Sequence, residues 1–167
     1  MIMPPKTFRA LLLLGSLMAA IPVSAATWQV AKDGSGDFTV IQDAVDAASS
    51  GDEIVIGPGR YTEYQTVGSP HQFDVHVLIP DGMALSFIGA GPEATIIGAD
   101  DPEVYENNTY GIGGVYDIGI TARGLSIENC SQYGIGISSG SVDVADCRFY
   151  YGGQPISETT GIDGGFT

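Results

Sequence analysis

The sequence predicts an all-β fold in which short strands stack as successive coils of a solenoid behind one capping helix. Three observations support this prediction. The chain has a single well-formed amphipathic helix, a long region of short apolar runs after it, and a repeat of solenoid size within that region. Because the first coil of a solenoid exposes strand edges, a helix at that end would cover them.

The first residues of the chain have the three parts of a signal peptide. Lys6 and Arg9 supply positive charge, twelve apolar residues follow, and small residues ending at Ala25 offer a cleavage site. The apolar run is too short to span a bilayer. We therefore assign 1–25 to a signal peptide and 26–167 to one domain, and expect a secreted or periplasmic protein with no membrane attachment after the signal is removed.

The helix is expected directly after a Gly/Asp-rich turn that follows an extended run at residues 28–31. Thr39 and Gln42 have the spacing of a capping box, in which the hydroxyl accepts an N–H and the Gln side chain reaches back. Residues 49–51 end the helix. One helical face carries Ile41, Ala44, Val45 and Ala48.

Short apolar or alternating runs follow the helix, and Gly, Asp, Asn or Pro separates them. This pattern is typical of an all-β chain with frequent turns. The runs are 53–56, 75–79, 84–88, 94–97, 114–120, 125–128, 134–138 and 142–145.

Residues 100–110 lack periodicity and carry four carboxylates, which predicts a loop between two coils. Ca²⁺ could bind there, but the spacing does not match a D-x-D-x-D loop, so no metal site and no cofactor is assigned. The carboxylates are Asp100, Asp101, Glu103 and Glu106.

A repeat favours a solenoid over a sandwich. Residues 125–130 (LSIENC) and 142–147 (VDVADC) correspond position by position, seventeen residues apart. Parallel stacking would place each residue about 4.8 Å from its counterpart. Cys130 and Cys147 would then lie within disulfide reach, either bonded or as unpaired interior thiols. The same stacking predicts burial of Leu125, Ile127, Val142 and Val144 on adjacent coils.

Several motifs resemble those of one known group of proteins. Residues 30–48 (VAKDGSGDFTVIQDAVDAA) resemble the N-terminal cap of right-handed parallel β-helix proteins of the pectin lyase-like superfamily. Residues 59–63 (GRYTE), 84–100 and 121–130 are similar to motifs of the pectin methylesterases (pectinesterases) within it. The resemblance, which runs from about Trp28 to Phe149, implies a right-handed parallel β-helix. Since the chain ends without a closing helix or polar cap, we expect the N-terminal portion of such a domain.

The resemblance also implies a catalytic set, and this sequence departs from it. Pectin methylesterases are understood to use an Asp nucleophile, an Asp acid, glutamines that stabilise the oxyanion, and an Arg. Gln132 and Gln154 are weak counterparts of the glutamines, and we interpret them as solvent-exposed coil residues in preference to an oxyanion hole. The acid position is Pro155, and the nucleophile and Arg motifs do not occur before Thr167. We expect the chain as given to be non-catalytic.

The charge of the chain limits its partners. Without the leader, four Lys and Arg remain against 20 Asp and Glu, which gives a net charge of about −16. This argues against nucleic acid and anionic membranes. A neutral or methyl-esterified glycan, or a contact bridged by Ca²⁺, fits better than a polyanionic glycan. The alternative is that the acidity only keeps a secreted protein soluble.

The sequence therefore predicts an exported β-helix module that contacts extracellular or periplasmic polysaccharide, pectin-like on the resemblance. One alternative is the N-terminal half of a pectinesterase-like enzyme whose catalytic aspartates lie beyond the chain end, and another is a structural or adhesive surface β-helix. Aromatic rings can stack on sugars, although packing at coil ends is also common for them. The candidate contacts are Tyr133, Arg148, Tyr150 and Tyr151.

Overall fold

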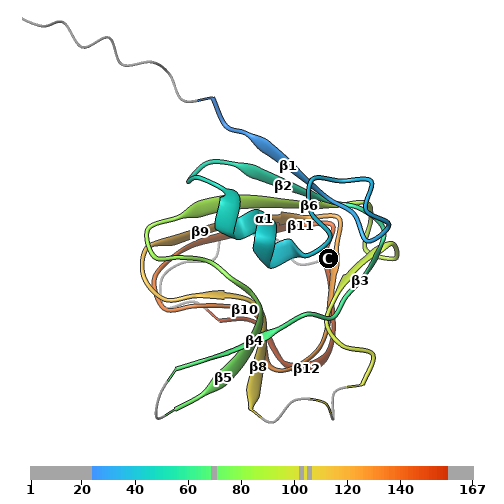
Figure 1. Ribbon diagram of the computed structural model, residues 1–167. Coiled ribbons are helices and arrows are strands. Elements are labelled where there is room, and N and C mark those ends of the chain that lie inside the picture. Colours follow the sequence, from blue (N-terminus) through green and yellow to red (C-terminus); the bar gives the residue numbers. More distant parts are fainter. Residues whose placement is uncertain (1–23, 69–70, 102–103, 105–106, 158–167) are drawn as a thin grey trace, which may run out of the picture.

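The computed structural model describes residues 24–68, 71–101, 104 and 107–157, with the side chains of 151–157 left out. Within these ranges the chain folds into twelve strands in two sheets and one helix, α1 (Ile41–Ala47) (Figure 1). All strand pairs are parallel except one antiparallel pair at a sheet edge. The predicted all-β class with a single helix is thus confirmed.

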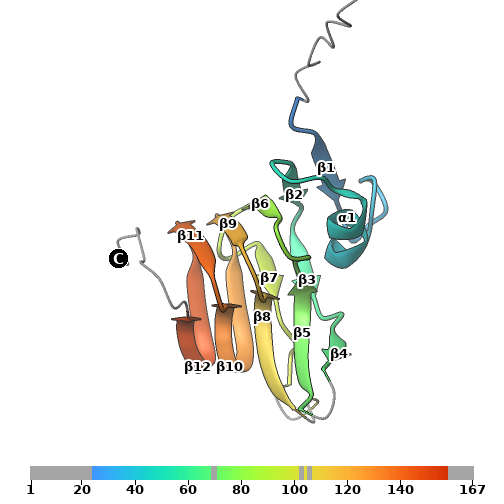
Figure 2. The ribbon, with the colours of Figure 1, turned by 90° about the vertical axis from the view of Figure 1, so that its left-hand side faces the viewer.

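The first sheet has five strands, and between successive strands the chain leaves the sheet and returns beside the previous strand. Their order in space follows their order in the sequence (Figure 2). They are β1 (Thr27–Val30), β2 (Glu53–Ile56), β6 (Ala84–Gly89), β9 (Ile118–Arg123) and β11 (Gly140–Ala145).

The second sheet bends and so has two arms. The start of β10 pairs with β7 and its end pairs with β8, and β12 follows β10 along both parts. Asn129 lies in the middle of β10 with φ 60°, a conformation that Asn tolerates better than most residues. The first arm is β3 (Gly59–Tyr61), β7 (Thr95–Ile97) and the start of β10 (Ser126–Ile137) and β12 (Arg148–Ser157); the second is β4 (Gln65–Val67), β5 (Phe73–Leu78), β8 (Asn108–Gly114) and the ends of β10 and β12.

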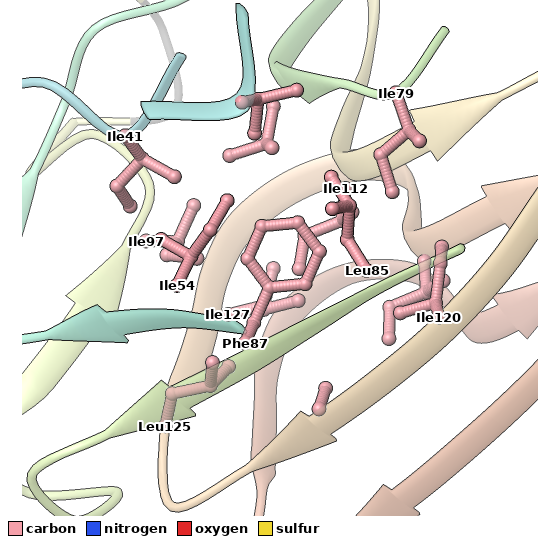
Figure 3. Close-up of a cluster of buried hydrophobic side chains, with 14 of the residues drawn as sticks. Ile41, Ile54, Ile79, Leu85, Phe87, Ile97, Ile112, Ile120, Leu125 and Ile127 are labelled. Atoms are coloured by element: carbon pink, nitrogen blue, oxygen red, sulfur yellow. The ribbon is translucent and has the colours of Figure 1, made fainter. Parts of the chain in front are cut away.

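The two sheets enclose one apolar core (Figure 3). In-register pairing aligns inward side chains of successive strands into columns. Ile54 pairs with Phe87, Phe87 with Ala122, and Ala122 with Val144. A second column in the first arm joins Ile97, Ile127 and Phe149. Burying each large side chain of these columns contributes about 1.5–3 kcal/mol.

Helix α1 covers one end of the stack, but its start differs from the prediction. Its N-cap is Val40, and no side chain caps it, so the capping box of Thr39 and Gln42 is wrong. Gln42 instead binds the main chain of Leu78: Nε2 donates to the carbonyl at 3.0 Å, and Oε1 accepts the N–H at 2.8 Å. The Gln42 amide thus satisfies backbone groups of β5 that a neighbouring strand would otherwise bind.

The seventeen-residue repeat is also wrong as a description of the coil. Val142 pairs with Ile120 and Arg148 with Ser126, so one coil takes 22 residues here. The two similar motifs lie in different sheets, on β10 and on β11. Leu125, Ile127 and Val142 are buried as expected and Val144 is partly buried, but they do not stack on one another.

The predicted proximity of the two cysteines fails for the same reason. Cys130 pairs in register with Gly152, whereas Cys147 stands beside Leu125, whose carbonyl accepts the N–H of Arg148. Both thiols are free. Burial raises the pKa of Cys130 to about 12, so this thiol stays protonated and unreactive.

The column through Phe87 gives a test of this core. Phe87 is fully buried, and Phe87→Ala should lower the free energy of unfolding by about 3–5 kcal/mol, because it leaves a cavity between β2 and β9. Tyr116, which is 64% exposed, is the matched control, and Tyr116→Ala should cost less than about 0.5 kcal/mol. Urea unfolding of both variants measures the difference, and equal losses would contradict the packing.

Candidate functional site

A cleft on the outer surface of the second arm is lined mainly by aromatic side chains and glycines. It crosses β5, β8 and β10, which lie side by side (Figure 2). Its volume is about 280 Å³. Its lining residues are Phe73, Tyr110, Gly113, Gly114, Val115, Tyr133, Gly136, Ile137 and Ser138.

Three aromatic rings, which we call the aromatic ladder, cross the strands along this cleft. The ring centroid of Tyr110 lies 5.0 Å from that of Phe73 and 5.5 Å from that of Tyr133, with interplanar angles of 64° and 45°. These separations are close to the spacing of neighbouring strands, about 4.8 Å. All three rings are partly exposed and stand outside the apolar core.

A shared irregularity in β8 and β10 turns the two tyrosines outward. In a regular strand, residues two apart face the same side. However, Ile112 and Ile135 are fully buried in the core, two residues after Tyr110 and Tyr133. Gly111 faces inward as well, since a Cβ there would lie 2.3 Å from Cγ2 of Ile127. Gly111 and Ile112 thus face inward one after the other, which breaks the alternation of a regular strand without a shift of register between β8 and its neighbours β5 and β10.

Two glycines make room for the ladder. Gly113 and Gly136 pair in register on the outer face of the sheet. A Cβ on Gly136 would lie 2.5 Å from Cδ1 and 2.8 Å from Cε1 of Tyr110, so the Tyr110 ring packs over this glycine. A Cβ on Gly113 would meet Val75 Cγ2 at 3.3 Å, a milder contact. The floor of the cleft is therefore main chain.

No charged side chain lines the cleft among the residues whose side chains the structure describes. Burial, with a smaller contribution from Tyr133, raises the pKa of Tyr110, so its hydroxyl is neutral and can both donate and accept hydrogen bonds. Asp74 follows Phe73, but it is buried and accepts hydrogen bonds from Thr66 (2.7 Å) and Asn107 (3.3 Å). The polar groups that face the cleft are thus hydroxyls.

The positive side chains lie elsewhere and are neutralised. Each Lys and Arg in the part of the chain that the structure describes forms an ion pair with a carboxylate. The pairs are Lys32–Glu63, Arg60–Asp100, Arg60–Glu128, Arg123–Asp143 and Arg148–Glu93.

The structure places one predicted contact, Tyr133, in this cleft. Gln132 is partly buried beside it, at a register shift of β10, and does not line the cleft. Arg148 and Tyr150 lie on the first arm, where Arg148 binds Glu93 and Tyr150 pairs in register with Glu128.

Two further predicted residues have side chains outside the described part. The backbone of Gln154 pairs in register with Tyr133, so it continues the line of the ladder onto β12. Tyr151 precedes it on the same strand. The structure says nothing of where either side chain points.

Sequence reasoning missed most of the cleft. The sequence pattern that could have revealed the cleft is a repeat. Residues 110–114 (YGIGG) and 133–137 (YGIGI) match at a separation of 23 and pair in register. Phe73 lies outside this repeat, because a longer coil with a loop separates it from Tyr110. Gly113 and Gly136 belong to the repeat, and their role follows only from the position of the Tyr110 ring.

The other candidate groups have structural roles or are not described. Glu103, Glu106 and residues 1–23 fall outside the described part. Within it, no cluster of metal ligands and no helix long and apolar enough to cross a membrane occurs. In the GRYTE motif, Tyr61 is buried and its hydroxyl donates to the Gly57 carbonyl at 3.1 Å.

Comparisons of the chain with protein-family models, with curated proteins and with solved structures found no match. The cleft is therefore interpreted from its own geometry and chemistry.

His76 should make the stability of the fold depend on pH. It is buried, and its Nδ1 lies 2.7 Å from the Glu63 carbonyl. Burial lowers its pKa, against smaller opposing effects of Glu63 and Asp74. The unfolded chain then binds a proton more readily, so stability should fall as pH drops below about 6.5.

Urea unfolding at about pH 7 and pH 5.5 tests this expectation, because carboxylates titrate mainly below this window. His76→Gln should be less pH-dependent than the natural chain, whatever its absolute stability. Identical pH dependence in the two proteins would show that His76 does not contribute.

Proposed function

We propose that the protein is an exported right-handed parallel β-helix module that binds extracellular or periplasmic polysaccharide through the cleft and does not catalyse a reaction. The observation that carries the proposal is the partly exposed aromatic ladder along the cleft. The parallel stacking, the 22-residue last coil and the helix at one end support the fold assignment, together with the resemblance of the cap.

The ladder suits a sugar chain for two reasons. The C–H face of a pyranose ring is apolar and packs on aromatic rings, while its hydroxyls require hydrogen-bonding groups at the rim. Tyr110, Tyr133 and Ser138 offer both kinds of contact. Because the rings repeat with the strands, a chain laid across the strands would contact one ring after another. The three rings pack on one another, but each also keeps a face toward the open cleft, where a ligand can contact it.

Removing a ring of the ladder should weaken binding. Tyr110→Ala and Tyr133→Ala should each reduce affinity for a bound polysaccharide about tenfold or more, because each removes a stacking surface and a hydroxyl. Affinity electrophoresis through gels that contain soluble plant, fungal and bacterial polysaccharides, followed by calorimetry on the best ligand, provides the measurement.

Two exposed tyrosines outside the cleft serve as matched controls. Tyr64→Ala and Tyr150→Ala should leave affinity within about twofold, since neither ring lines the cleft. Tyr133→Phe, which keeps the ring, should retain most of the binding. If the control variants lose as much affinity as the ladder variants, the cleft is not the binding site, and binding to no polysaccharide would favour a structural or adhesive β-helix.

We also expect no methylesterase activity, which separates this proposal from the pectinesterase alternative. The position where the resemblance requires a general acid is Pro155, which has no ionisable side chain. Methanol release from methyl-esterified pectin should equal that of buffer. Release that depends on Gln132 or Gln154, tested with Gln132→Ala and Gln154→Ala, would instead support the enzyme.

A further inference from the structure

We propose that the cleft selects an uncharged polysaccharide over a polyanionic one such as a polyuronate. This inference rests on the proposed function and adds the ligand class. It is carried by the uncharged lining of the cleft, by the pairing of every described Lys and Arg with a carboxylate, and by the acidity of the chain.

A polyuronate presents a carboxylate on each sugar, and none of the described side chains that line the cleft is a cation that could receive it. Moving an ionised carboxylate out of water against Phe73, Val115 and Ile137 would be costly without a paired charge. The net charge of −14 would also repel an approaching polyanion at low ionic strength. An uncharged sugar incurs neither penalty.

The four Lys and Arg side chains that the structure describes are already bound to carboxylates and lie away from the cleft. Arg60 bridges Asp100 and Glu128 and also donates to the carbonyls of Gly98 and Ala99, so it holds the first arm to the loop that follows β7. Arg123 joins β9 to β11 in the first sheet, through Asp143. Releasing either one for a ligand would leave its carboxylates unpaired, and none of the four lines the cleft.

The polar atoms that do face the cleft match neutral hydroxyls. A tyrosine or serine hydroxyl both donates and accepts, as does each sugar hydroxyl, so no charge is needed on either side. The raised pKa of Tyr110 keeps its hydroxyl protonated at neutral pH. Val115, which is 37% exposed, extends the apolar wall beside Ser138.

The experiment compares polymers that share a backbone and differ in charge. One pair is highly methyl-esterified pectin and the same pectin after de-esterification; the other is hydroxyethyl cellulose and carboxymethyl cellulose. The natural protein and Tyr110→Ala are titrated with each at low and high NaCl, without Ca²⁺ and then with it. The uncharged member of at least one pair should bind about tenfold or more tightly than its partner, with little effect of NaCl, and Tyr110→Ala should abolish the preference.

A gain-of-function variant tests the same idea independently. Ser138 lies exposed at the cleft rim, and Ser138→Lys supplies the missing cation there. This variant should bind the anionic polymers more tightly than the natural protein does, in a salt-sensitive way, and bind the uncharged ones within about twofold of it. Ser138→Asn is the neutral control.

The outcomes distinguish the two proposals. If the natural protein binds the anionic member as tightly as the uncharged one, or only in the presence of Ca²⁺, polysaccharide binding stands and the charge selectivity is wrong. If it binds neither member of either pair nor any polymer of the wider panel, the proposed function itself is overturned, and the selectivity with it.

Discussion

The in-register pairing of parallel strands is the constraint on which the rest of the structure depends. It places residues of successive coils about 4.8 Å apart, so that a side chain meets its counterpart on both neighbours. Inside, this produces the column of Ile54, Phe87 and Ala122, which holds the first sheet together. Outside, the same pairing sets Tyr110 beside Tyr133, while the ring of Phe73, whose register partner is Asn108, reaches Tyr110 diagonally. One geometric rule thus builds both the core and the candidate site.

Such stacking leaves unpaired strand edges at each end of the stack, and helix α1 covers one of these ends. The apolar face of α1 closes the core, since Ile41, Ala44 and Val45 are buried. The bidentate contact of Gln42 with Leu78 then replaces hydrogen bonds that another strand would supply. From its spacing, Gln42 was predicted to cap the helix, but it binds the edge of the sheet instead. Leaving buried backbone groups of that edge without hydrogen bonds would cost more free energy than leaving the helix start exposed to water.

Local pattern predicted the helix and most strands of the first sheet, but it missed β3, β4, β8 and β12 and assigned partners poorly. The strand at 53–56 and the helix follow from polarity and propensity alone. The break at Asn129 was predicted, since the runs 125–128 and 134–138 are separated there, but both runs belong to one bent strand, β10. The repeat predicted between residues 125–130 and 142–147 paired β10 with β11, which is wrong. A match of six residues does not determine the register when every coil carries alternating apolar residues. The YGIG repeat at 110 and 133 was the true one, and only its register reveals the cleft.

The cleft depends on the side chains that its glycines lack as much as on its aromatic rings. Side chains at Gly113 and Gly136 would fill its floor, and inward-facing Gly111 is part of the break in strand alternation that leaves Tyr110 outward. The ring of Tyr110 then occupies space that only the missing Cβ of Gly136 leaves free. The main-chain groups of this floor pair with neighbouring strands, so the side chains around it supply most of the contacts open to a ligand. The recognition that we propose for this surface therefore uses ring faces and hydroxyls, which the coil geometry positions, rather than a cluster of charged groups.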